Sequence, residues 1–219
     1  MDRQTLRYMK YRVMLERRQL IRPVATRRLR QLIAHGSPPW NVQVGAGGVE
    51  LPGWVNTDVR YPTDYWLDAT RPWPFHEGTV TRVFSDNVIE HMSIESGRSF
   101  LRCAFVALGH GGKIRIVTPD AAGCVHAYLT KPDIHLHAMQ AQGRQAEHPV
   151  DLIRSAFSLW GHHTGYVYDE HALRTELERA GFISVRRYPP GESFDPGLQH
   201  LDRQPSNADF YLAMEGTKP

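Results

Sequence analysis

The sequence predicts an α/β fold in which helices wind around a parallel sheet. Strand and helix patterns alternate from about residue 41 to residue 215, which is typical of parallel sheets. A glycine turn, Gly45-Ala46-Gly47-Gly48, follows the first short strand, and a carboxylate, Asp58, closes the second. Because open sheets of this class bind ligands at the carboxyl ends of their strands, these residues mark a candidate nucleotide-ligand site.

The composition indicates one globular domain. The chain has 219 residues, of which 41% are hydrophobic and 22% charged, and its longest apolar runs, such as residues 103–108, are too short to cross a bilayer. It contains two cysteines, and the basic first residues have no apolar stretch behind them. We therefore expect a cytoplasmic protein without disulfides or a secretory signal peptide.

Residues 1–36 form a basic arm ahead of the domain, which spans residues 37–219. The arm has ten Lys or Arg against two acidic residues, a charge of +8, which leaves −5 for the rest of the chain with its net +3. Apolar spacing predicts one helix over residues 4–22, a break at Pro23 and a second helix ended by Gly36. The arm favours contact with nucleic acid or an anionic membrane surface at the inner face of the membrane. A solvated helical surface is the alternative.

The elements of the domain follow in order. Strands are predicted over residues 42–44, 54–58, 66–67, 80–84, 113–117, 182–188 and 209–215, and helices over 88–107 and 169–180. Gly109, Gly111 and Gly112 are expected to end the first of these helices. Between residues 120 and 165 the sequence has helical patterns only, at 121–129, 134–142 and 150–160. An insertion of this length beside the strand ends predicts a helical lid or substrate-pocket wall.

Six segments together resemble the class I S-adenosylmethionine-dependent methyltransferases, and in particular their type 11 branch. They are VQVGAGG, PGWVNTD, LDATRPWPF, FSDNVIEHM, LGHGGKIRIVTPD and YDEHALRTELERAGF. The resemblance covers about residues 41–216. It implies a Rossmann-like, doubly wound sheet of seven strands, mostly parallel, with an antiparallel last strand over residues 209–215 and helices on both faces.

The same resemblance implies a set of residues that bind S-adenosylmethionine. Gly45 and Gly47 would form the turn under the methionine part of the cofactor, and Asp58 would accept hydrogen bonds from the ribose hydroxyls. Such charge-assisted bonds are strong in a partly desolvated cleft. At the other end of the cofactor, Asp68 would accept from the adenine amino group and the N–H of Ala69 would donate to the ring. Ser85 would line the methionine end.

The sequence departs from the family pattern at two places. Gln43 stands where many relatives have an acidic residue near the methionine ammonium. Gly45 and Asp58 are only thirteen positions apart, against about 20 in dinucleotide sites, so any helix between them must be brief or absent.

Methyl transfer to a hydroxyl needs a base and a collinear arrangement of the nucleophile and the methyl group. The candidates for that base are His91, Asp86 and His163, with Asp120 and His162 as further possibilities. For each of these residues a structural or capping role is the alternative.

Two patterns suggest metal ligands. Residues 87–91 resemble the Glu-x-x-Glu-His metal site of some methyltransferases, but Asn87 replaces the first Glu, and a neutral amide is a poorer ligand for a hard cation than a carboxylate. The pair His135 and His137 has no Cys or carboxylate cluster beside it at a zinc spacing. We therefore expect no metal.

The resemblance implies a methyltransferase that uses S-adenosylmethionine. We expect O-methylation of a small or carbohydrate-derived acceptor, as in polysaccharide biosynthesis, with the basic arm near lipid-linked, phosphorylated precursors. One alternative is an RNA methyltransferase that uses the same arm against phosphates. Another is a non-catalytic scaffold or partner subunit that binds the cofactor.

Overall fold

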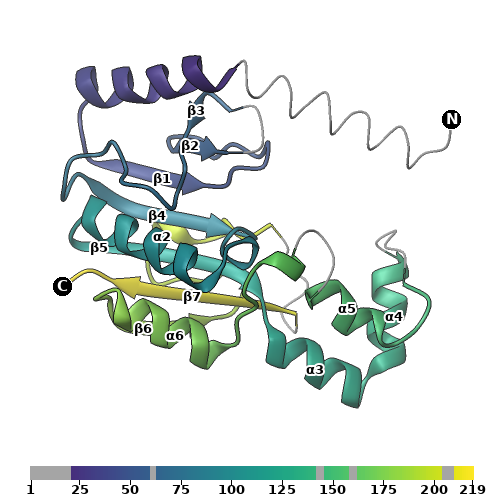
Figure 1. Cartoon of the computed structure of the whole chain (residues 1–219). Coiled ribbons are helices and arrows are strands. Elements are labelled where there is room, and N and C mark those ends of the chain that lie inside the picture. The colour runs from purple at the N-terminus through teal and green to yellow at the C-terminus, as the bar shows by residue number, and fades with distance from the viewer. Residues whose placement is uncertain (1–20, 60–62, 142–145, 158–161, 204–209) are drawn as a thin grey trace, which may run out of the picture.

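The structure is a computed structural model, and it describes residues 21–59, 63–141, 146–157, 162–203 and 210–219. Most of the expected first helix, at residues 4–22, lies outside the described residues. Figure 1 shows the whole chain, with the described elements as ribbons.

Seven strands form one sheet in the order β3-β2-β1-β4-β5-β7-β6. All neighbouring strands pair in parallel except β7, which runs antiparallel to both β5 and β6. The strand order reverses at the β1–β4 pair, where ligands of open sheets usually bind. The expected Rossmann-like sheet of seven strands, mostly parallel with an antiparallel last strand, is confirmed. The strands are β1 (Trp40–Val44), β2 (Val55–Asp58), β3 (Tyr65–Trp66), β4 (Val80–Asp86), β5 (Leu108–Pro119), β6 (Ile183–Tyr188) and β7 (Tyr211–Thr217).

The helices of the described residues follow the chain order that the sequence predicts. The first described helix covers residues 21–35. The later α-helices are α2 (Ile94–Ala107), α3 (Ala121–Thr130), α4 (Pro132–Ala141), α5 (Asp151–Phe157) and α6 (Glu170–Arg179), and the short 3-10 helices are η1 (Ile89–His91), η2 (His162–Thr164) and η3 (Pro196–Leu198).

One face of the sheet carries most of the apolar core and is covered by helices. Phe100 and Leu101 of α2 and Leu173 and Leu177 of α6 are fully buried against the strands. Leu29 of the helix at residues 21–35 joins the same cluster. Figure 1 shows that helix beside β3, with α2 and α6 further along the sheet. Burial of such side chains supplies the largest favourable free-energy term of the fold.

The other face is covered mainly by two connections. A second, smaller cluster contains Phe84, Val117, Tyr211 and Ala213, with side chains from both connections packed on it, namely Leu51, Trp54 and Leu201. Trp54 meets Phe84 edge to face, with ring centroids 6.3 Å apart. The β1–β2 and β6–β7 connections therefore form the cover that reaches the carboxyl edge of the sheet.

The helices α3, α4 and α5 lie beyond the carboxyl ends of the parallel strands (Figure 1). They pack on one another around a separate apolar cluster that includes Leu136, Met139 and Leu152. Asp120 begins α3 by accepting a hydrogen bond from the N–H of Ala122 at 3.1 Å. The helices of the predicted insertion are present, and its role as a lid stays a prediction.

Three boundaries differ from the sequence prediction. The helix at residues 21–35 runs through Pro23, because the φ that proline fixes is itself a helical value. Residues 88–93 do not extend α2, which begins after Ser93, whose side chain accepts from the N–H of Ser96. Gly109 does not end α2 as a turn but lies in β5, where a Cβ would be 2.8 Å from the carbonyl oxygen of Gly78.

Candidate functional site at the carboxyl edge of the sheet

The glycine turn after β1 is held against the end of β2. The N–H groups of Gly45 and Ala46 donate to the carbonyl oxygen of Thr57 at 2.9 and 3.0 Å. Gly45 and Gly47 have φ values of 75° and 59°, a region that side chains disfavour and glycine does not. The glycines thus allow the sharp turn after β1 that the sequence predicts for a GxGG segment, and the predicted contact of this turn with a ligand stays a prediction.

Asp58, the last residue of β2, lies across this turn. Its Oδ2 accepts a hydrogen bond from the N–H of Gly47 at 2.8 Å, and the residue is 5% exposed. Residues 45–54 contain turns and no helix, which explains the short glycine-to-Asp58 spacing. Asn56 fixes this connection through hydrogen bonds with the backbone of Leu51 and Trp54.

The candidate adenine residues lie just after β3, which pairs with the end of β2. Asp68 accepts from the N–H and the hydroxyl of Thr70 at 3.0 and 2.7 Å, and its other oxygen is 3.2 Å from Nε of Arg71. The carbonyl of Ala69 accepts from the indole of Trp73 at 3.1 Å. Asp68 therefore orders its own turn, and its predicted contact with adenine stays a prediction.

Arg203, which the sequence analysis did not single out, lies over the glycine turn. Its Nη2 donates to the carbonyl oxygens of Gly45 and Ala46 at 2.9 and 2.8 Å. Its backbone N–H donates to Oδ2 of Asp86 at 2.9 Å. The β6–β7 connection therefore reaches both β1 and β4, although nothing in its sequence pattern indicates this contact.

Ser85 and Asp86 end β4 with buried side chains. Ser85 is 0% exposed and pairs in register with Val44 of β1. Asp86 is 2% exposed and also accepts from Nδ2 of Asn87 at 2.5 Å. Burial raises the pKa of the Asp86 carboxyl, while the backbone hydrogen bond from Arg203 and the charge of that side chain oppose the rise. The predicted roles of Ser85 and Asp86 stay predictions.

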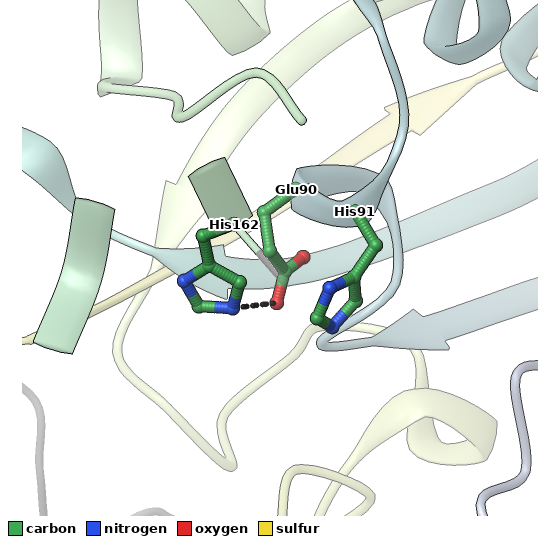
Figure 2. A group of neighbouring side chains, drawn as sticks. All are labelled: Glu90, His91 and His162. Carbon is green, nitrogen blue, oxygen red and sulfur yellow. Dashed lines mark ion pairs between the residues drawn. The ribbon is translucent and has the colours of Figure 1, made fainter. Parts of the chain in front are cut away.

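Glu90, His91 and His162 come together just beyond these strand ends (Figure 2). Each contributes one possible ligand atom, and these atoms all lie within 4.8 Å of one another. Nε2 of His162 is 4.0 Å from Oε1 of Glu90, and the rings of His91 and His162 have centroids 4.9 Å apart. The sequence analysis named both histidines separately, and the fold brings them to one carboxyl group.

Glu90 is fully buried, and only one of its two carboxyl oxygens accepts a hydrogen bond from the described residues. Its Oε2 accepts from the hydroxyl of Thr118, at the end of β5, at 3.1 Å. Its Oε1 accepts no hydrogen bond from any described residue. Burial raises the pKa of Glu90 to about 8, and the nearby charge of Asp86 adds to the rise.

The other two candidate bases have different outcomes. Asp120 forms an ion pair with Arg187 at 3.0 Å besides capping α3, which matches the structural alternative for this residue. His163 follows His162 in η2, but its side chain lies outside the described residues. Its predicted role stays a prediction.

The strand order, the antiparallel β7 and the glycine turn after β1 define the class I S-adenosylmethionine-dependent methyltransferase fold. A solved structure from Thermotoga maritima, described as a methyltransferase of this kind and possible histamine N-methyltransferase, matches 96% of this chain and 97% of its own, with 13% identity and a TM-score of 0.50. This likeness shows the fold.

Two further solved structures have lower TM-scores. A possible exported protein from Bordetella parapertussis has 17% identity over 93% of this chain and 67% of its own, with a TM-score of 0.46. The S-adenosylmethionine-dependent methyltransferase SibL has 17% identity over 92% of this chain, which spans 55% of SibL, with a TM-score of 0.48. No protein-family model and no curated protein matches the sequence. None of the described helices is both long and apolar enough to span a bilayer.

The residues at this edge fit the chemistry of S-adenosylmethionine. The carbonyls of Gly45 and Ala46 accept from the guanidinium of Arg203, so they are equally able to accept from the ammonium of the methionine part. A Cβ on Gly48 would meet no atom within 4 Å, whereas a Cβ on Gly47 would be 2.9 Å from Nη1 of Arg203, which covers that part of the turn. The Asp58 carboxylate stands on the opposite side of the turn, at the end of β2.

Proposed function

We propose that this protein is a methyltransferase that uses S-adenosylmethionine. The observation that carries the proposal is the hydrogen bond between the N–H of Gly47 and the Asp58 carboxylate. It joins the glycine turn of β1 to the acidic end of β2 at the point where an open sheet binds nucleotide ligands.

Each residue of the edge has a task in this proposal. The glycine turn receives the methionine part, and Asp58 binds the ribose diol through charge-assisted hydrogen bonds. When bound, S-adenosylmethionine supplies a methyl group on a sulfonium. The acceptor must be held in line with that methyl group, and α3, α4 and α5 lie beyond the strand ends where they can form the acceptor pocket.

The acceptor is an oxygen nucleophile on a small or carbohydrate-derived molecule. Asp86, at the end of β4, is a buried carboxyl that accepts a hydrogen bond from Arg203, which in turn contacts the glycine turn, and such a group is able to take the proton of a hydroxyl. A role in polysaccharide biosynthesis fits the basic residues 1–36, whose charge attracts phosphorylated, lipid-linked precursors.

Incorporation of labelled methyl from the cofactor into fractionated cell extract identifies the acceptor. Label in RNA would favour the RNA methyltransferase instead, and cofactor binding without any incorporation would favour the scaffold.

The cofactor assignment is tested by calorimetry with S-adenosylmethionine and S-adenosylhomocysteine. Asp58→Ala should weaken both by roughly 10- to 100-fold, because hydrogen bonds to a charged group contribute about 1.5–3 kcal/mol. Asp64→Ala is the matched control, since Asp64 is an exposed carboxylate that pairs with Arg28 away from the turn. Equal affinities for the native protein and Asp58→Ala would disprove the assignment.

A further inference from the structure

The sequence analysis expects no metal, because Asn87 replaces a carboxylate ligand, but the fold brings His162 to Glu90 and His91. These three residues come from two parts of the chain, η1 after β4 and η2 in the insertion after β5. Figure 2 shows the carboxyl group between the two imidazole rings. We propose that these three side chains bind one divalent transition-metal ion.

The three candidate ligand atoms lie close together, but slightly farther apart than the ligands of a bound metal ion. Nitrogen and oxygen ligands lie about 2.0–2.2 Å from zinc, so tetrahedral ligands are roughly 3.3 Å from one another. The three candidate atoms are within 4.8 Å of one another, and the Glu90–His162 pair is at 4.0 Å. Small rotations of the side chains therefore bring all three to bonding distance without a movement of the backbone.

Glu90 is buried without a positive partner among the described residues. The residue is 0% exposed, and no Lys or Arg of the described residues forms an ion pair with it. An isolated buried carboxylate is strongly unfavourable, and its Oε1 accepts no hydrogen bond from the described residues. A metal cation supplies both the charge and the missing bond.

The backbone holds the two ligand segments together. A Cβ on Gly165 would be 1.8 Å from the carbonyl oxygen of Glu90, so η1 and the residues after η2 touch with no space for a side chain. The N–H of Tyr166 donates to the carbonyl of Met92 at 2.9 Å, and the N–H of Gly165 donates to that of His162 at 3.0 Å. The position of His162 next to Glu90 and His91 is thus fixed by main-chain contacts.

The chemical types of the three ligands indicate which metal ion the site would bind. Two imidazoles and one carboxylate suit zinc or iron(II), whereas magnesium and calcium prefer oxygen ligands only. Three protein ligands leave at least one coordination position for water or for an oxygen of another molecule. The other histidine pair does not compete, because His135 packs edge to face on Phe210 and His137 is exposed.

The site lies directly beside the glycine turn. A Cβ on Gly45 would be 2.2 Å from Cγ2 of Val88, the residue that precedes η1. An oxygen of an acceptor bound to the metal would therefore face the region where we place the methionine part. This placement, unlike the metal binding itself, rests on the proposed function.

The experiment is a titration of the metal-free, full-length protein with Co²⁺, followed by its visible absorption and by displacement with Zn²⁺, in the absence of cofactor. We expect one Co²⁺ per chain. Glu90→Gln and His162→Gln should each weaken binding by more than about 100-fold, because even the loss of an outer hydrogen-bond partner costs 10- to 100-fold. His137→Gln is the control for adventitious binding to an exposed imidazole, and thermal melts check that each variant is folded.

The outcomes separate the metal from the cofactor. Binding that persists in Asp58→Ala, and cofactor binding that persists in Glu90→Gln, support two independent sites. Native protein that binds no Co²⁺, or binding unchanged in the folded His162→Gln variant, overturns the metal site and leaves the cofactor assignment intact. The converse result, Co²⁺ bound but no cofactor bound, refutes the proposed function alone.

Discussion

Two buried acidic clusters in this protein are satisfied in different ways. On the sheet face covered by connections, Arg115 is 0% exposed and forms ion pairs with Asp202 at 2.5 Å and Glu215 at 2.6 Å. At the carboxyl edge, Glu90 is equally buried but has only Thr118 and two imidazoles around it. The first cluster contains its own permanent cation, and the second does not.

The comparison separates acidic residues that stabilise the fold from an acidic residue that is available to bind a ligand. Arg115 also donates to the carbonyl of Glu192 at 2.9 Å, so its guanidinium ties β5 and β7 to the β6–β7 connection and leaves nothing for a ligand. Although burial alone would lower the pKa of Arg115, its hydrogen bonds and the charges of its two carboxylate partners raise that pKa. A buried carboxyl without such a partner, like that of Glu90, is typical of a site.

Removal of the guanidinium should give the largest effect on stability. Arg115→Met leaves Asp202 and Glu215 buried without their donor, which should cost about 3–5 kcal/mol of unfolding free energy. Urea denaturation at neutral pH measures it. Arg154→Met is the control, because the Arg154 side chain is 60% exposed in its pair with Asp151 at 3.3 Å, and ion pairs that water reaches contribute little to stability. Similar losses in both variants would contradict the comparison.

The second prediction concerns the pH dependence of stability in metal-free protein, with chelator present. The pKa of Glu90 is about 8 in the folded state against 4.5 for the ordinary group. Between these values the folded state keeps a proton that the unfolded state has lost, so this group stabilises fully below pH 4.5 and its contribution falls as the pH rises towards 8.

The measurement compares native protein with Glu90→Gln by urea denaturation from pH 5 to pH 8. The native protein should lose stability relative to the variant, by about 1 kcal/mol per pH unit. His91, His162 and Asp86 face the same carboxyl group, and all three are present in both proteins, so the difference isolates Glu90. If the stabilities of the two proteins changed in parallel over this pH range, the pKa of Glu90 would not be raised and the prediction would be wrong.

The smallest of these changes in unfolding free energy is expected for a partly exposed ion pair, Arg82 with Asp195. Arg82 donates to Asp195 through Nε and Nη2 at 3.0 and 2.8 Å, and its side chain is 26% exposed. Arg82→Met should cost about 1 kcal/mol, because water reaches the pair and Lys113 remains 3.8 Å from Asp195. Denaturation at neutral pH would show a loss between those of Arg115→Met and Arg154→Met, and a loss as large as that of Arg115→Met would remove the link between burial and cost.

The sequence alone was sufficient to predict features that depend on residues close to one another along the chain. The glycine turn and Asp58 were recognised because each directly follows a strand pattern, and strand ends of a parallel sheet meet at one edge. The short spacing between them indicated a brief or absent helix, and the β1–β2 connection contains none. The break at Pro23 was wrong, because a local preference against helix does not forbid one.

The sequence was insufficient for contacts made across the fold. His162 meets Glu90 only because Gly165 and Tyr166 pack on the backbone after η1, and no periodicity reports such a contact. Arg115 lies in a strand pattern that reads KIRIV, where an arginine usually points to solvent, and its acidic partners are in distant segments. In each case the signal is a tertiary pairing of charges rather than a local pattern.

Arg203 gives the glycine turn an internal competitor. Its guanidinium occupies the carbonyls of Gly45 and Ala46, the same acceptors that we assign to the cofactor ammonium. A cofactor that takes these acceptors must displace the side chain, so the free energy of the Arg203 contacts is subtracted from the cofactor's affinity. By reciprocity, the bound cofactor loosens the hold of Arg203 on the turn by an equal amount. The β6–β7 connection is then thermodynamically linked to cofactor occupancy through a single side chain.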